Sequence, residues 1–205
     1  GVISVCVLLD PKTIAVLTSY DEGETFNRTD LVQGDTSAVA PRIFKNVDGG
    51  FILFATQGTN QNFSLKYSRS PDGIKWSEFE EFSSAKDLHN SFVPDFTVLP
   101  SGRETVVFQS LFLENNRITY QLYSAYSDDK GVTWSDAVLV TDAQAAGGNI
   151  ISYTNQRPFL HEFNGTLYLA WERSQAGSVK PSVVVAALSE EGRINGPIEQ
   201  LSPKQ

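Results

Sequence analysis

The stretch YSDDKGVTW, Tyr126–Trp134, combines a turn glycine with hydroxyl and carboxylate side chains that can accept hydrogen bonds from backbone amides. A near copy, SYDEGETF, occupies Ser19–Phe26, and a shortened copy, SPDGIKW, occupies Ser70–Trp76. Glycine can take the positive φ of a tight turn, and the closing aromatic can pack under a neighbouring turn. The pattern therefore predicts a structural hairpin corner that touches no ligand. The residues assigned to these corners are Ser19, Asp21, Gly23, Phe26, Ser70, Asp72, Gly73, Trp76, Ser127, Asp129, Gly131 and Trp134.

The corners belong to a longer repeat. Three similar segments begin at prolines, as APRIF at Pro41, VPDFT at Pro94 and RPFLH at Pro158. Each is followed by a glycine turn, an apolar segment and a further segment that ends in serine. These segments are rich in Val, Ile, Phe, Tyr and Leu and are bounded by Gly, Pro and Asn, which is typical of strands. Each repeat is therefore predicted to hold four short antiparallel strands, called A (after the proline), B, C and D.

A four-stranded sheet repeated every 50–60 residues or so is typical of a β-propeller. The sequence therefore predicts an all-β fold, a β-propeller of four-stranded antiparallel blades with the corners at the C–D hairpins. Its expected blades are residues 1–34 (incomplete, strands B–D), 37–84, 91–141 and 152–202.

The pattern S-x-D-x-G-x-T-W resembles the Asp-box, or BNR repeat, of the sialidase/neuraminidase superfamily. The copies at Ser19 and Ser127 match it, with Phe26 in place of Trp, whereas the copy at Ser70 is one residue shorter and has Lys75 in place of Thr. The resemblance implies fold more than function, because the same box occurs in sialidases, other glycosidases, adhesins and receptor ectodomains. It also implies an extracellular, cell-surface or periplasmic protein.

Sialidases bind the substrate carboxylate with three arginines, the first of them two residues before a strand A proline. Here those positions hold Val39, Phe92 and Gln156. Arg42 and Arg157 lie next to their prolines, so in a regular strand their side chains would point to the other face. A complete sialidase site is therefore not demonstrable in this chain.

By the same resemblance, a ligand would bind at the face that carries the D-to-A and B-to-C loops. Polar residues follow the turn glycine by seven positions in three strands B, at Gln57, Gln109 and Glu172. Asp95 and Glu172 are the candidate general acid and base. The candidate ligand-binding residues are Arg42, Gln57, Gln109, Arg117, Tyr153, Arg157 and Arg173. The alternative is that Arg42, Asp95 and Arg157 pair with one another and only neutralise buried charge.

Composition excludes several classes of partner. The net charge of −8 disfavours nucleic acid and anionic membranes. No apolar run reaches the roughly 18 residues of a membrane span, and Val2–Leu9 is predicted to be a buried strand with an inert thiol at Cys6. No metal site or cofactor is predicted.

Three functions remain open at this point. The first is a sialidase-like module that recognises a glycan or another small polar ligand. The second is a glycoside hydrolase of exo-sialidase type with the rest of its site in further blades, and the third is a protein-interaction or sensor ectodomain. Because the first blade lacks strand A, we expect a partial chain of a longer propeller; the alternatives are a propeller that a second chain completes and a closed four-bladed ring.

Overall fold

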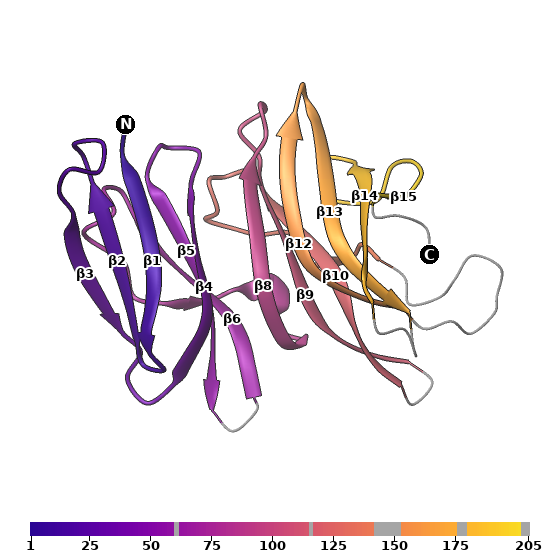
Figure 1. Cartoon of the computed structure of the whole chain (residues 1–205), viewed down its shortest axis with the longest axis horizontal. Coiled ribbons are helices and arrows are strands. Elements are labelled where there is room, and N and C mark those ends of the chain that lie inside the picture. The colour runs from indigo at the N-terminus through magenta and orange to yellow at the C-terminus, as the bar shows by residue number, and fades with distance from the viewer. Residues whose placement is uncertain (60–61, 115–116, 142–152, 176–179, 202–205) are drawn as a thin grey trace. The chain divides into compact units, whose positions relative to one another are not determined.

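The computed structural model describes residues 1–59, 62–114, 117–141, 153–175 and 180–201. They form strands and one short 3₁₀ turn, η1 (Ser83–Ala85), and none of the described segments is a helix able to span a bilayer. The chain divides into two compact units, Gly1–Val93 and Pro94–Gln205 (Figure 1). The predicted all-β fold of antiparallel sheets is confirmed.

The first unit holds two sheets. The first sheet has three strands in the order β1-β2-β3, and the second has four in the order β4-β5-β6-β7. The strands are β1 (Ile3–Asp10), β2 (Thr13–Ser19), β3 (Asn27–Val32), β4 (Ser37–Lys45), β5 (Phe51–Thr59), β6 (Asn62–Ser70) and β7 (Glu80–Glu81).

The second unit also holds two sheets, the third and fourth, each with four strands. Their orders are β8-β9-β10-β11 and β12-β13-β14-β15, and β8 begins within the first unit. The strands are β8 (His89–Val98), β9 (Glu104–Glu114), β10 (Arg117–Ser127), β11 (Val138–Leu139), β12 (Tyr153–Phe163), β13 (Thr166–Gln175), β14 (Ser182–Leu188) and β15 (Glu199–Gln200).

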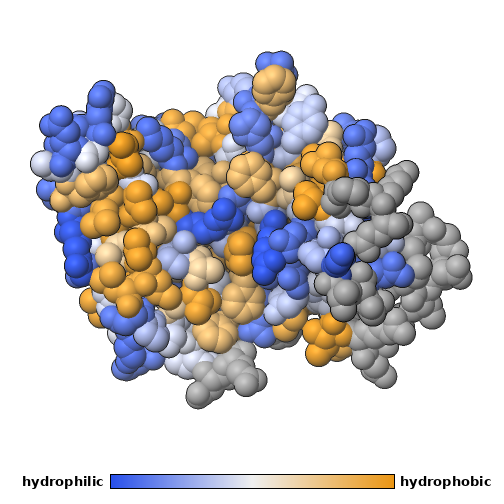
Figure 2. All heavy atoms as spheres, viewed as in Figure 1, coloured by the Kyte–Doolittle hydropathy of each residue, from blue (hydrophilic) through white to orange (hydrophobic). Residues whose placement is uncertain are grey.

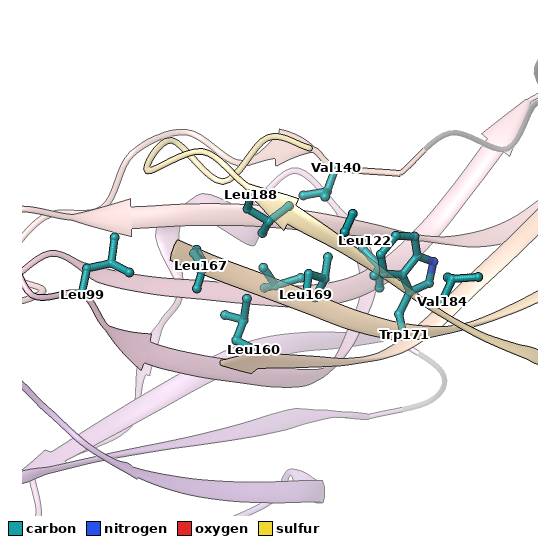
Figure 3. Packing of buried hydrophobic residues seen from close by; sticks show 11 residues of the cluster. Leu99, Leu122, Val140, Leu160, Leu167, Leu169, Trp171, Val184 and Leu188 are labelled. Atoms are coloured by element: carbon teal, nitrogen blue, oxygen red, sulfur yellow. The ribbon is translucent and has the colours of Figure 1, made fainter. Parts of the chain in front are cut away.

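Each unit has a core between its two sheets. In the first unit, Ile14 and Val16 of β2 cluster with Leu53 and Ala55 of β5. In the second unit, side chains of β9 and β10 meet those of β12, β13 and β14 around Trp171 (Figure 3). Successive side chains of a strand point to opposite faces, so the residues that alternate with these core residues lie on the other face of the sheet.

The first strand is not buried as predicted. In β1 the side chains of Ile3, Val5, Val7 and Leu9 are 41–49% exposed, and only the alternate face packs on the core. Cys6 lies on that inner face, half-buried, and burial raises the pKa of its thiol. The prediction failed because an apolar run does not reveal whether another sheet covers its second face.

The Ser–Asp–Gly corners form the predicted turns. At the first corner, Gly23 has φ 96° and its N–H donates to Ser19 Oγ at 2.8 Å. Ser19 Oγ donates in turn to Asp21 Oδ1 at 2.7 Å, and Asp21 accepts the backbone N–H of Thr25 at 2.9 Å and its hydroxyl at 2.5 Å. The carboxylate and the serine thus replace the ladder partners that the turn amides lack.

The other corners repeat this bonding. Asp129 accepts the N–H and the hydroxyl of Thr133 at 2.8 and 2.6 Å. Asp72 has no such hydroxyl, because Lys75 stands in the threonine position, and it accepts the N–H groups of Ile74 and Lys75.

The closing aromatics differ between corners. Trp76 packs against the core of the first unit, as predicted, and its indole N–H donates to the Gly73 carbonyl at 3.1 Å. Phe26 is 46% exposed, so its expected burial is wrong.

The corners also bond to the adjacent sheet within each unit. Thr18 Oγ1 of β2 donates to the Gly73 carbonyl at 3.0 Å, and Ser124 Oγ of β10 donates to the Gly192 carbonyl at 2.9 Å. Gly73 has φ 75°, and a Cβ there would lie 2.7 Å from Thr18 Oγ1. The corner after Ser189 docks in a similar way through Gly192, where a Cβ would lie 2.2 Å from Ser124 Oγ, although this corner lacks an aromatic residue.

We expect Ser70→Ala to lower the free energy of unfolding by about 1–3 kcal/mol, because the buried N–H of Gly73 loses its acceptor, Ser70 Oγ, at 2.7 Å. Urea denaturation monitored by circular dichroism measures the change. The matched control is Ser101→Ala in an exposed turn, expected within about 0.5 kcal/mol of the parent. Equal effects of the two substitutions would contradict the structural role of the corner serine.

The acid sensitivity of the corners can be tested at Asp21. Hydrogen bonds from the Thr25 hydroxyl, the Thr25 amide and Ser19 lower the pKa of Asp21 from 3.8 to about 2. This carboxylate therefore stabilises the fold above its unfolded pKa, and the contribution is lost as pH falls through the folded pKa.

Asp21→Asn should accordingly lower the melting temperature at neutral pH, and the deficit should shrink as pH approaches about 2. Thermal melts of the parent and the variant across this range provide the measurement. A deficit that stays constant down to the lowest pH would contradict the assignment.

Candidate functional site

The end of the sheets opposite the corners carries a cluster of polar and aromatic side chains in the second unit. There β12 begins and β13 ends, and Asn155 is paired with Arg173 in the ladder. Tyr153 opens β12, and Trp171 lies two residues before Arg173 on the same face of β13. We call Tyr153, Asn155, Trp171 and Arg173 the Arg173 cluster.

Asn155 is the centre of a buried hydrogen-bond network. Its Oδ1 accepts from the indole N–H of Trp171 at 2.7 Å and from Arg173 Nε at 3.3 Å. Its Nδ2 donates to Gln121 Oε1 of the third sheet at 2.8 Å. Indole and guanidinium groups only donate, so their contacts fix which way the Asn155 amide points.

Gln121 extends this network across the third sheet. Its Oε1 also accepts from Thr141 Oγ1 at 2.8 Å, and its Nε2 donates to the Tyr153 carbonyl at 2.8 Å and to Thr119 Oγ1 at 3.1 Å. Gln121 and Asn155 are fully buried, and each uses both ends of its amide. Such a satisfied network holds the third and fourth sheets and the Trp171 ring in one arrangement.

Arg173 is the charged member of the cluster. Its guanidinium carbon lies 5.0 Å from the ring centre of Tyr153 and 5.4 Å from that of Trp171, within the range of cation–π attraction. Burial lowers the pKa of Arg173, although the group stays charged at neutral pH. Within the described residues no carboxylate pairs with it. The cluster therefore presents a partly desolvated cation with unused N–H donors.

Strand A of each complete sheet is kinked next to its proline. The residues before Pro41, Pro94 and Pro158 are Ala40, Val93 and Arg157, with φ of 48°, 47° and 53°. Residues before proline disfavour helical conformations, and a β-branched residue with positive φ is a genuine outlier. The ladder register shifts at the kinks of β4 and β12. The regular strand geometry against which the side chains of Arg42 and Arg157 were placed is therefore interrupted at these kinks.

The kink of β12 brings three predicted site residues together. The buried side chain of Gln109 accepts the backbone N–H of Arg157 at 2.9 Å, which satisfies the amide that the kink removes from the ladder. Arg157 Nη1 then pairs with Glu172 Oε2 at 2.6 Å. Glu172 and Arg173 are adjacent in β13, so their side chains lie on opposite faces of the fourth sheet. The pair is therefore separate from the Arg173 cluster.

Asp95 lies two residues after Val93, the kinked residue of β8, and is 4% exposed. Its Oδ2 accepts the backbone N–H of Leu160, in β12, at 2.6 Å. This bond ties the third sheet to the fourth and gives the buried carboxylate a structural task. The role of Asp95 and Glu172 as acid and base remains a prediction.

Two predicted residues belong to the first unit. The guanidinium of Arg42 lies 5.8 Å from the ring centre of Phe44. Gln57 is buried, and its Nε2 donates to Gln33 Oε1. The side chain of Arg117, a third predicted residue, is outside the described part of the structure.

The ladder register corrects the predicted equivalence of Gln57 with Glu172. Gln57 pairs with Ala38, three residues before Pro41, just as Arg173 pairs with Asn155, three residues before Pro158. Gln57 therefore occupies the position of Arg173. The count was wrong because the first turn glycine with positive φ is Gly49 (φ 82°), not Gly50.

Sequence reasoning missed the network residues, whose role depends on the register between strands. The signal that could have found Asn155 is a polar residue placed opposite Arg173, which only the pairing of β12 with β13 reveals.

The fold is that of a β-propeller built from four-stranded antiparallel blades. A thermostable family-43 glycoside hydrolase matches with a TM-score of 0.66 and 14% identity, over 95% of this chain and 66% of that chain. An endo-arabinase from Bacteroides thetaiotaomicron matches with a TM-score of 0.65 and 17% identity, over 98% of this chain and 77% of that chain.

The GH93 alpha-L-arabinofuranosidase of Fusarium graminearum, solved with arabinobiose, has a TM-score of 0.54 and 15% identity, over 90% of this chain and 55% of that chain. This chain thus spans about half to three quarters of the length of these structures. No protein-family model matches the sequence, and no curated protein matches it either. At these identities the similarity shows the propeller fold and leaves the sialidase resemblance without further support.

We expect Asn155→Ala to lower the free energy of unfolding by about 2–3 kcal/mol, because the buried Trp171 Nε1 loses its acceptor and Gln121 Oε1 loses one of its two donors. The control is Gln156→Ala, the next residue of β12, which lies on the other face and outside the network. Urea titration followed by tryptophan fluorescence measures both. A loss no larger than that of the control would show that the network does not hold the two sheets.

Proposed function

We propose that this protein is a carbohydrate-binding β-propeller of the glycoside hydrolase type and that its glycan binds at the Arg173 cluster. The observation that carries the proposal is the guanidinium of Arg173, held against Tyr153 and Trp171 by a satisfied network and paired with no carboxylate among the described residues. Glycan sites combine aromatic faces for the sugar ring with a few fixed hydrogen-bond donors for its hydroxyls. Tyr153 supplies an aromatic face and Arg173 supplies the donors, while Trp171, which is 2% exposed, contacts Arg173 from the core.

The similar structures support this class of ligand. Those compared above are named as glycoside hydrolases or arabinanases, and one was solved with arabinobiose. The sequence resemblance to sialidases points to the same class, sugars recognised by a propeller.

The charge of Arg173 favours a glycan that carries a carboxylate, such as a uronic or sialic acid. A guanidinium binds a carboxylate through two parallel hydrogen bonds, and this interaction is stronger in a partly desolvated site than in water. A neutral arabino-oligosaccharide would use the Tyr153 ring but leave the charge of Arg173 uncompensated. The ligand would therefore gain most of its specificity from Arg173.

Hydrolysis is the second candidate function, favoured by the glycosidase names of the similar structures. The described carboxylates support it less well than binding. Glu172 is paired with Arg157 and lies on the opposite face of β13 from Arg173, and Asp95 is bonded to the backbone of Leu160. If the protein hydrolyses a glycan, Glu172→Gln should abolish turnover and leave affinity at the Arg173 cluster unchanged.

We expect Arg173→Gln to weaken binding of a carboxylated oligosaccharide by roughly tenfold to a hundredfold, because the charge-assisted bonds are lost. Isothermal titration calorimetry with a uronic-acid oligosaccharide and a neutral arabino-oligosaccharide measures the change. Arg193→Gln, an exposed arginine at the corner end, is the matched control.

Two results would contradict the proposal. The parent could fail to bind any oligosaccharide on a glycan array, or Arg173→Gln could bind as tightly as the Arg193→Gln control. Circular dichroism of each variant confirms that a loss of affinity is not a loss of fold.

A further inference from the structure

The sequence contains two Asn-Gly dipeptides, and both belong to the repeat that forms the fourth sheet. Asn164-Gly165 connects β12 to β13, and Asn195-Gly196 lies between the corner after Ser189 and β15. Asparagine is a thermolabile residue, and a following glycine makes it more so, because glycine has no Cβ to hinder attack by its own backbone nitrogen. The structure gives the two dipeptides different surroundings.

The reaction at such a dipeptide is the loss of the side-chain amide. The backbone nitrogen of the glycine bonds to Cγ of the asparagine and ammonia leaves, which produces a five-membered succinimide ring. Water then opens the ring at either carbonyl and yields aspartate or isoaspartate. For the ring to close, the glycine N–H must lose its proton. The Cα–Cβ bond of the asparagine must also lie nearly eclipsed with the C–N bond to the glycine.

The turn at Asn164 has a conformation that opposes ring closure. Asn164 has φ 51° and Gly165 has φ 79°, and these two residues alone join β12 to β13, so they form a type I′ turn. In the left-handed conformation ψ is about +30–50°, which places Cβ and the next backbone nitrogen on opposite sides of the Cα–C bond. Asn164 would therefore have to leave the turn before it could react.

Glu162 opposes the same reaction in a second way. Its Oε1 accepts the Gly165 N–H at 2.6 Å, and this is the nitrogen that would have to attack Asn164. Loss of its proton would place a negative nitrogen beside a carboxylate, and like charges oppose ionisation. Asn164 is protected in this way although it is exposed. The β12–β13 turn projects at the top of the view and ends in hydrophilic side chains (Figures 1 and 2).

The peptide group between Asn195 and Gly196 has neither form of protection. It makes no hydrogen bond to any of the described residues, and the contact of Asn195 on the other side is its N–H, which donates to the Ala187 carbonyl at 2.8 Å. Asn195 does not have the positive φ of Asn164, and its side chain is exposed to water. This peptide group can therefore rotate to the eclipsed arrangement without breaking a hydrogen bond of its own.

We propose that Asn195 is a site of spontaneous modification to aspartate and isoaspartate, and that the type I′ turn and Glu162 keep Asn164 as an amide while the protein is folded. The conversion places a new carboxylate in the connection that leads to β15. It requires water as the only co-reactant. Because it involves neither a glycan nor the Arg173 cluster, it is independent of the proposed function.

Peptide mapping by mass spectrometry tests the proposal on the folded 205-residue chain, incubated at physiological temperature and mildly alkaline pH. We expect Asn195 to convert roughly tenfold faster than Asn164 or more, because Asn164 must first give up its turn and the bond to Glu162. Unfolding in urea provides the matched control. Each asparagine follows a large apolar residue, Phe163 or Ile194, so in urea the two should convert at similar rates.

Glu162→Ala tests the protecting carboxylate. This variant should raise the rate at Asn164 severalfold and leave the rate at Asn195 unchanged. Glu24→Ala removes an exposed glutamate from the first corner and should change neither rate. Equal rates at the two sites of the folded protein, an Asn195 that keeps its amide, or a Glu162→Ala variant whose Asn164 reacts as in the parent would each overturn the proposal. Circular dichroism verifies that each variant is folded.

Discussion

A backbone N–H or C=O group at an interrupted β-ladder has lost its partner, and this protein supplies the missing partner with side chains at both ends of its sheets. At the corner end, Ser19 and Asp21 take the turn amides, and the other corners repeat the arrangement. At the opposite end, Gln109 accepts the amide released by the kink at Arg157, and Gln121 donates to the carbonyl of Tyr153. These short antiparallel sheets depend on such side-chain partners, because each buried backbone group left unpaired would cost about 1–3 kcal/mol.

The two ends differ in what remains after the backbone is satisfied. At the corners, the polar side chains are engaged in hydrogen bonds within the turn. The carboxylates of Asp21 and Asp129 accept several hydrogen bonds each, and these bonds lower the pKa of both to about 2. At the other end the buried amides of Gln121 and Asn155 are equally committed, yet they hold in place a guanidinium that still has donors to offer. The rigidity of the network and the unused capacity of Arg173 together make this end suited to a ligand. Of the two rings beside Arg173, Tyr153 is the one that is not buried in the core, and it favours a ligand with a ring face to stack.

The sequence predicted those features that repeat locally. The motif residues alone identified the corners, and the proline-headed repeat predicted the antiparallel sheets. It could not predict the left-handed kinks, because a residue before proline disfavours that conformation and the chain adopts it only where tertiary contacts such as Gln109 to Arg157 compensate. The hydrogen bond between Asn155 and Trp171 depends on strand register, which the sequence does not reveal. Counting from the wrong turn glycine shifted the predicted register by one residue, so Gln57 was matched with Glu172. The exposure of β1 depends on whether another sheet covers its outer face, which an eight-residue segment of sequence cannot reveal.

Under the proposed function, ligands bind at the Arg173 end of the sheets and leave the corners untouched. The three tryptophans report on it separately, since Trp76 and Trp134 lie in corners and Trp171 lies in the cluster. Their indole N–H resonances should be followed by two-dimensional NMR while a carboxylated oligosaccharide is added to the nitrogen-15-labelled protein. We expect the Trp171 resonance to shift in a saturable manner while those of Trp76 and Trp134 stay in place. Saturable shifts of the corner tryptophans with an unmoved Trp171 would contradict the account.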